Sequence, residues 1–96
     1  MDISSNALLN INDYITIKEE NNFIALNILS WELYDYIEDI LNEEYEISHN
    51  GFIDNKTIKP DSYKMIFNDT SLMMKLTEII NKLDLNEVHR IYKINN

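Results

Sequence analysis

A dense run of carboxylates is the most reactive-looking feature of this sequence. No Lys or Arg occurs between Lys18 and Lys56, whereas ten acidic residues lie there: Glu19, Glu20, Glu32, Asp35, Glu38, Asp39, Glu43, Glu44, Glu46 and Asp54. The whole chain has 8 Lys and Arg against 17 Asp and Glu, a net charge of -9. Such a surface attracts basic proteins and repels nucleic acid and anionic membranes.

The carboxylates of residues 31–44 have the spacing of one face of an amphipathic helix. Ser30 is a favourable N-cap, and apolar residues recur at helical intervals, at Leu33, Ile37, Ile40 and Leu41. At 100° per residue, one arc of about 140° on the opposite side holds Glu32, Asp35, Glu38, Asp39 and Glu43. Like charges at these spacings cost about 0.2–0.5 kcal/mol per pair, and interleaved lysines would remove that cost. Their absence indicates that the charge has a use.

The density of this charge is close to that of a nucleic-acid strand. Six carboxylates between Glu32 and Glu44 give about one charge per ~3 Å of helix axis. One strand of DNA carries one charge per ~3.4 Å. The helix is therefore suited to a Lys/Arg groove that binds a nucleic-acid backbone. The alternative interpretation is a solvated helix face without a partner.

Aromatic residues beside the acids could anchor such an interface. Trp31 lies at the edge of the acidic arc, where either core packing or partner contact would suit it, and Tyr36 lies at the border of the two faces. Tyr34 belongs with the apolar stripe. The expected partner-binding residues are Trp31, Glu32, Asp35, Tyr36, Glu38, Asp39, Glu43, Glu44 and Glu46.

Catalytic and ligand-binding motifs are poorly represented in the sequence. His49 and His89 have no metal-ligand spacing between them. The single Gly excludes Gly-rich phosphate loops, and the chain has no Cys. The paired carboxylates of the acidic helix would be the acid/base candidates, but among so many like charges they form a field rather than a site. We therefore expect no catalytic residues, no cofactor and no metal.

The elements that would position the acidic helix follow from periodicity. Alternation predicts a hairpin from 14–18 and 23–29, before the helix 31–44. Asn50-Gly51 favours a type I′ turn, and so a second hairpin with arms at 45–49 and 52–58. A strand at Tyr63–Phe67, a helix over 71–83 capped by Asp69 or Thr70, and a last strand Val88–Ile94 follow, with a short helix at 4–12.

This order predicts one α+β domain over residues 1–96. Its expected architecture is a two-layer sandwich, with a mostly antiparallel sheet of about five strands and two helices on one face, in a ββα-ββα-β-like order. The sequence has no basic segment followed by an apolar run, as a secretory signal requires, and no apolar stretch of about 18 residues. A cytoplasmic location in a bacterium or a phage-infected cell is expected.

In size, charge and lack of catalytic motifs, the chain resembles small acidic inhibitors that mimic nucleic acid and immunity proteins that neutralise nuclease toxins. The expected function is to block a basic nucleic-acid-handling protein, either as an immunity protein or as a phage anti-defence inhibitor of the anti-CRISPR type, without binding nucleic acid or membranes. The alternative is a non-catalytic structural or regulatory subunit that self-associates through a sheet edge. The sequence leaves open whether a homodimer forms.

Overall fold

The sheet and helices are described by a computed structural model for residues 7–12, 14–55 and 62–95. Its strands are β1 (Ala7–Asn12), β2 (Ile15–Glu19), β3 (Ile24–Leu29), β4 (Gly51–Asn55) and β5 (Ser62–Phe67). Its α-helices are α1 (Trp31–Tyr45), α2 (Met73–Asn81) and α3 (Leu85–Tyr92), with 3-10 turns at Thr70–Leu72 and Lys93–Asn95. The sheet order is β1-β2-β3-β5-β4, with each neighbouring pair antiparallel. The predicted α+β class and antiparallel sheet are confirmed.

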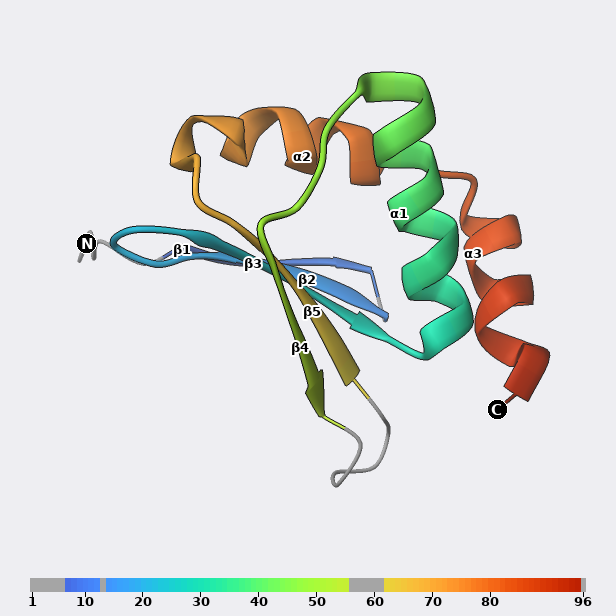
Figure 1. Ribbon diagram of the computed structural model, residues 1–96. Helices are drawn as coiled ribbons and strands as arrows, with labels where there is room; N and C mark the ends of the chain where they lie inside the picture. Colours follow the sequence, from blue (N-terminus) through green and yellow to red (C-terminus); the bar gives the residue numbers. More distant parts are fainter. Residues whose placement is uncertain (1–6, 13, 56–61, 96) are drawn as a thin grey trace.

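The sheet buries one face, because its strands alternate between apolar and more polar side chains. Ile15 and Ile17 of β2 are fully buried, whereas Thr16 and Lys18, which alternate with them, are at least partly exposed. In β5, Tyr63, Met65 and Phe67 point into the core in the same way. Helices α1 and α2 cover that face, and α3 lies beside α1 (Figure 1).

The acidic helix α1 begins and ends where local chemistry requires it. Ser30 is the N-cap, and its Oγ accepts a hydrogen bond from the Leu33 amide at 3.2 Å. Glu46 ends the helix in the left-handed conformation at φ 56°, and the amides of Glu46 and Ile47 both donate to the Leu41 carbonyl. The predicted hairpin before the helix, the Ser30 cap and the helix itself are confirmed.

The predicted type I′ turn at Asn50-Gly51 is wrong. Residues 46–49 form no strand, and Gly51 starts β4 opposite Ile66 without a positive φ. The Asn50 amide donates to the Ile66 carbonyl at 2.7 Å, and the Asn50 side-chain oxygen accepts from the Asn68 amide at 2.8 Å. Asn50 therefore fastens the start of β4 to the end of β5, and the chain does not reverse there.

Replacing Asn50 with Ala is expected to lower the free energy of unfolding by about 1 kcal/mol, the net contribution of a typical hydrogen bond. The Asn68 amide would lose its side-chain acceptor, while the backbone bond from Asn50 to Ile66 would remain. Urea unfolding followed by circular dichroism measures the change. Asn22→Ala, in the exposed loop between β2 and β3, is the matched control. Equal stability of the two variants would contradict the fastening role.

The predicted last strand Val88–Ile94 is also wrong, because residues 88–92 belong to α3 and residues 93–94 to the 3-10 turn that follows it. The Asp84 side chain accepts from the amides of Asn86 and Glu87, which starts the helix. Val88 and Ile91, three residues apart, are both buried. The alternation of apolar residues in this segment is typical of a strand. The Asp84 cap and the i,i+3 spacing of the two buried residues instead favour a helix. Two helices were expected on the sheet, whereas the described residues form three α-helices.

Two further predictions concern a helix over residues 71–83 and a short helix at residues 4–12. The expected helix over 71–83 is present as a 3-10 turn followed by α2, and Asp69 caps it by accepting from the Ser71 amide at 3.0 Å. The short helix expected at 4–12 is wrong for residues 7–12, which form β1, and residues 4–6 lie outside the described residues. β1 pairs with β2 and so gives the backbone groups of β2 a partner strand.

Candidate functional site

The outer face of α1 displays its carboxylates to solvent. Asp35, Asp39, Glu43 and Glu44 are exposed, whereas Glu32 and Glu38 are partly exposed. On the opposite side, Leu33, Ile37 and Leu41 are buried. No described Lys or Arg forms an ion pair with Asp35, Asp39 or Glu43. The helix thus carries a one-sided negative charge that these side chains do not neutralise.

A hollow between α1 and the C-terminal segment gathers part of the predicted interface. This hollow, here called the acidic groove, has a volume of ≈ 520 Å³ and is lined by Trp31, Glu32, Asp35, Tyr36, Asp39, Ile91 and Ile94. Its carboxylates come from α1, while Ile91 of α3 and the half-exposed Ile94 supply an apolar wall. Charged side chains with aliphatic stems suit such a lining, since Lys and Arg bury their stems and keep their charged ends near acids.

The other predicted partner-binding residues lie outside the groove. Glu38 faces the segment after α1, where its Oε2 is 3.7 Å from His49 Nδ1. Glu43 and Glu44 are exposed on the last turns of α1, and Glu46 is exposed at its C-cap. These acids extend the negative field away from the groove without lining it.

Tyr36 connects the acidic face of α1 to α3. Burial raises the pKa of its hydroxyl, and the carboxylates of Glu87, Asp84 and Glu44 raise it further, with Arg90 opposing them. The phenol therefore stays protonated at neutral pH and can act as a hydrogen-bond donor. The first turn of α3 therefore contributes to the negative field around the groove. A strand at residues 88–94, as predicted, did not imply this contact with α1.

Trp31 has both a packed and an exposed part. Its ring stacks on Tyr34 at a centroid distance of 5.2 Å and meets Tyr63 edge-on at 5.6 Å, yet 47% of the residue is exposed. It also lines a second hollow of ≈ 430 Å³ with Phe52, Asp54 and Tyr63, here called the aromatic hollow. Residue spacing does not associate Phe52 and Asp54 with Trp31, because they lie on β4, whose place in the sheet depends on long-range pairing with β5.

The two histidines each contact a tyrosine hydroxyl. His49 Nε2 lies 3.0 Å from the Tyr34 hydroxyl, and His89 Nδ1 lies 2.5 Å from that of Tyr14. Burial, and then the charge of Glu38, raises the pKa of Tyr34 to about 12. A phenol that is only 2% exposed and protonated at neutral pH is a poor nucleophile. The Tyr34–His49 contact fastens the segment after α1 to the helix.

The raised pKa of Tyr34 predicts a specific loss of stability in alkali. A folded-state pKa of about 12 against an ordinary value of 10.0 means that the stabilisation is complete below pH 10 and is lost between pH 10 and 12. At pH 12 the loss is about 2 kcal/mol. Tyr34→Phe lacks this titration, so its unfolding free energy relative to wild type should rise by that amount. Urea unfolding from pH 8 to 12 measures it, and parallel curves would contradict the assignment.

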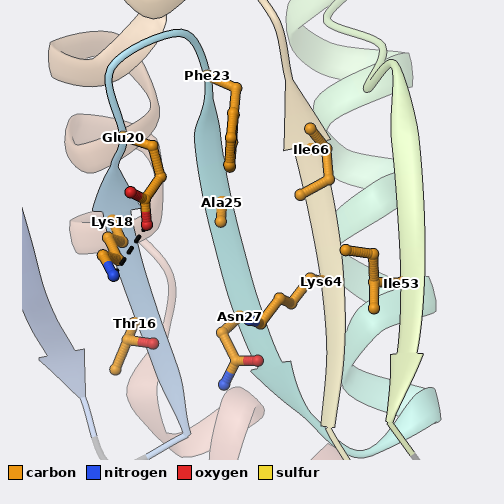
Figure 2. A pocket seen from close by; sticks show the side chains of 9 residues that line it. All are labelled: Thr16, Lys18, Glu20, Phe23, Ala25, Asn27, Ile53, Lys64 and Ile66. Carbon is orange, nitrogen blue, oxygen red and sulfur yellow. Dashed lines mark ion pairs between the residues drawn. The ribbon is translucent and has the colours of Figure 1, made fainter. Parts of the chain in front are cut away.

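A third hollow lies on the open face of the sheet, away from the helices (Figure 2). It has a volume of ≈ 720 Å³ and is lined by Thr16, Lys18, Glu20, Phe23, Ala25, Asn27, Ile53, Lys64 and Ile66. Lys18 Nζ pairs with Glu20 Oε2 at 2.8 Å. The period-two alternation of β2 and β5 is the sequence signal for this surface, whose residues are not among the expected partner-binding residues. Its charge is mixed, unlike that of the acidic groove.

Within 7–12, 14–55 and 62–95, no three or more His, Cys, Asp or Glu side chains are grouped so that they could hold a metal ion. No helix in this part of the chain has the length and apolar character needed to cross a membrane. Comparisons of the chain with protein-family models, with curated proteins and with solved structures gave no match.

Proposed function

We propose that the protein binds and blocks a basic, nucleic-acid-handling protein by placing the acidic face of α1 and the acidic groove against its phosphate-binding surface. The observation that carries the proposal is the convergence of Trp31, Glu32, Asp35, Tyr36 and Asp39 on one groove with an apolar wall. Interfaces combine a few desolvated aromatic anchors with a charged rim, and this groove offers both.

The uncompensated charge of α1 supports the same function. Asp35 and Asp39 are exposed, four residues apart and without a described Lys or Arg as ion-pair partner. Their repulsion costs stability in the free protein, and a Lys/Arg surface would relieve it on binding. A negative field also raises the association rate with a positively charged partner, by a factor that falls as the salt concentration rises.

Two biological settings fit this function, an immunity protein that neutralises a nuclease toxin and a phage anti-defence inhibitor. Both place an acidic protein on a basic groove, and both imply a cytoplasmic target and no direct binding to nucleic acid. In either setting the blocked protein and its nucleic acid compete for one surface. That competition is the property to test.

The test is capture followed by displacement. Immobilised protein is incubated with an extract of the native host, the retained proteins are identified, and an excess of a 20-base-pair DNA duplex is added. We expect a basic nucleic-acid-binding protein that the duplex releases, because both ligands use the same Lys/Arg surface. A neutral polymer such as dextran is the control. Retention of only acidic proteins, or of a partner that DNA does not release, would contradict the proposal.

A sheet edge supports the alternative of a self-associating, non-catalytic subunit. β4 is one of the two outer strands of the sheet order, and its Phe52 and Ile53 are 45% and 47% exposed. Exposed edges of this kind can pair with a second chain. Light scattering during size-exclusion chromatography separates the two functions, because only the alternative requires a dimer that Ile53→Lys disrupts.

A further inference from the structure

The hollow on the open face of the sheet, here called the open-face hollow, contains a row of hydrogen-bond donors. Strand pairing places Thr16 opposite Asn27, and Asn27 opposite Lys64, so that these lining residues lie side by side across β2, β3 and β5. Residues paired in this way have Cβ atoms about 4.5–5.5 Å apart. Figure 2 shows the side chain of Lys64 reaching toward Asn27. A hydroxyl, an amide and an ammonium group, which can all donate, are therefore neighbours on one face.

The next row of the open-face hollow has a low, apolar centre. Ala25 lies opposite Ile66 of β5, and Phe23 precedes it by two residues. The Ala25 methyl group is too short to fill the space between these longer side chains, although the residue is only 8% exposed. Its chain neighbours Ile24 and Leu26 are fully buried in the core on the other face. The floor of the hollow is therefore apolar and held in place from behind.

The charge of the open-face hollow favours an anion. Lys18 Nζ pairs with Glu20 Oε2 at 2.8 Å. Lys64 is partly buried, and within the described part of the chain no carboxylate forms an ion pair with it. An ammonium group beside apolar surface attracts an anion more strongly than it does in bulk water. The hollow thus combines an unpaired positive charge with an apolar floor in a protein whose net charge is -9.

We propose that the open-face hollow binds a small aromatic molecule that carries one anionic group, such as a carboxylate or a sulfonate. The anionic group accepts hydrogen bonds from Lys64 and Asn27, and the ring lies on Ala25 between Phe23 and Ile66. A planar ring can pack against the Phe23 ring, whereas a cationic ligand would be repelled by Lys64. The volume of ≈ 720 Å³ lies within the range of about 300–1,000 Å³ that is usual for small-molecule sites.

This inference goes beyond the proposed function, because the two surfaces lie on opposite sides of the sheet. Helices α1 and α2 cover one face, and the open-face hollow lies on the other (Figures 1 and 2). A ligand in the hollow would leave the carboxylates of α1 free for the basic partner. The test therefore needs no partner, and its outcome does not depend on whether α1 binds one.

The probe is 8-anilinonaphthalene-1-sulfonate, an aromatic anion whose fluorescence rises in apolar surroundings. Its control is N-phenyl-1-naphthylamine, which has the same rings but no charge. We expect saturable, one-to-one binding of the sulfonate at low salt, at least about tenfold tighter than that of the neutral compound, because a charge-assisted hydrogen bond is gained. Equal affinities for the two compounds, or no saturable binding of the sulfonate, would overturn the proposal.

Two matched variants locate the bound probe. Lys64→Met and Lys82→Met each remove one positive charge and keep an unbranched side chain, but Lys82 is exposed at the C-cap of α2, outside the hollow. Lys64→Met should weaken sulfonate binding about fivefold or more, whereas Lys82→Met should change it little. Ala25→Leu, which fills the floor, should weaken the binding of the sulfonate by a similar factor. Circular dichroism confirms that each variant is folded. Equal effects of the two lysine variants would place the probe elsewhere and overturn the proposal.

A second copy of the chain is the other occupant that an open sheet face could have. The proposal requires the open-face hollow to be free in the isolated protein, so light scattering during size-exclusion chromatography should show a monomer at the concentration of the titration. A dimer that Ala25→Leu converts to a monomer would show that a second copy covers this face, and it would overturn the proposal.

Discussion

The double substitution Asp35→Lys and Asp39→Lys is expected to weaken binding to the basic partner by about 3 kcal/mol, or more than a hundredfold. Both carboxylates line the acidic groove, so each reversal replaces an attraction by a repulsion at the proposed contact. The loss should appear largely in the association rate at low salt, where steering is strongest. Surface plasmon resonance at two salt concentrations measures it.

The same substitution should leave the fold intact. Lys at position 35 would face Glu32 and Glu38, and Lys at position 39 would face Glu43, at spacings that favour opposite charges. Of the pairs that these two positions form at such spacings, only 35/39 would still carry like charges. Thermal unfolding should therefore show equal or slightly higher stability, so that lost binding cannot be ascribed to unfolding.

A single-site comparison controls for net charge. Asp39→Lys and Glu78→Lys change the charge of the chain equally, but Glu78 is exposed on α2 and does not line the groove. We expect Asp39→Lys to weaken binding at least tenfold more than Glu78→Lys, about 1.4 kcal/mol. Equal losses of affinity in these two variants would mean that α1 acts only through the net charge of the protein. They would contradict a direct contact between the partner and the groove.

Trp31→Ala is expected to lower partner affinity by about 3 kcal/mol, within the range of an aromatic hot spot. Its side chain lines both hollows, so truncation enlarges each and removes the anchor between them. The cost in folding should be smaller, about 1 kcal/mol, because the residue is half-exposed. Isothermal titration calorimetry with the captured partner measures the binding change.

The control for Trp31→Ala is a second large side chain that contacts neither hollow. Met74 on α2 is 84% exposed, and Met74→Ala should leave affinity unchanged. A binding loss shared by both variants would indicate a general effect of surface apolar area. A fully retained affinity in Trp31→Ala would show that the partner contacts α1 without using its tryptophan.

Local chemistry allowed β2, β3 and α1 to be predicted from the sequence. Ser30 has the hydroxyl that a helix start requires, and Leu33, Ile37 and Leu41 recur at helical spacing. The alternation of Ile15 and Ile17 identified β2 in the same way. These signals depend on residues close in sequence, so they can be recognised without the tertiary structure.

The errors have a common physical origin in ambiguous local signals. Asn50-Gly51 has the residue types of a hairpin turn, but hydrogen bonds to Ile66 and Asn68 use Asn50 in another way. Val88, Tyr92 and Ile94 fit the alternation of a strand, but the buried pair Val88 and Ile91 has the i,i+3 spacing of a helix face. In both places a contact or cap outside the pattern decides the conformation.

Only the α1 side of the acidic groove was predicted from the sequence. The α1 side chains of the groove followed from helical spacing, whereas Ile91 and Ile94 join them only because α3 lies beside α1. Phe52 and Asp54 meet Trp31 because β4 pairs with β5. Strand order and helix docking set these contacts, and neither can be obtained from the spacing of residues in a single element.

Ser30 is the only residue between the end of β3 and the start of α1. It adopts a left-handed φ of 78° while its hydroxyl caps the helix, so no flexible linker separates the acidic helix from the sheet. One inserted glycine after Ser30 would shift the helical register by about 100°. The carboxylates would then turn away from Ile91 although every one of them remained in the chain. The angular setting of the acidic helix thus depends on one small residue outside the groove, and insertion mutants at this joint would measure that dependence.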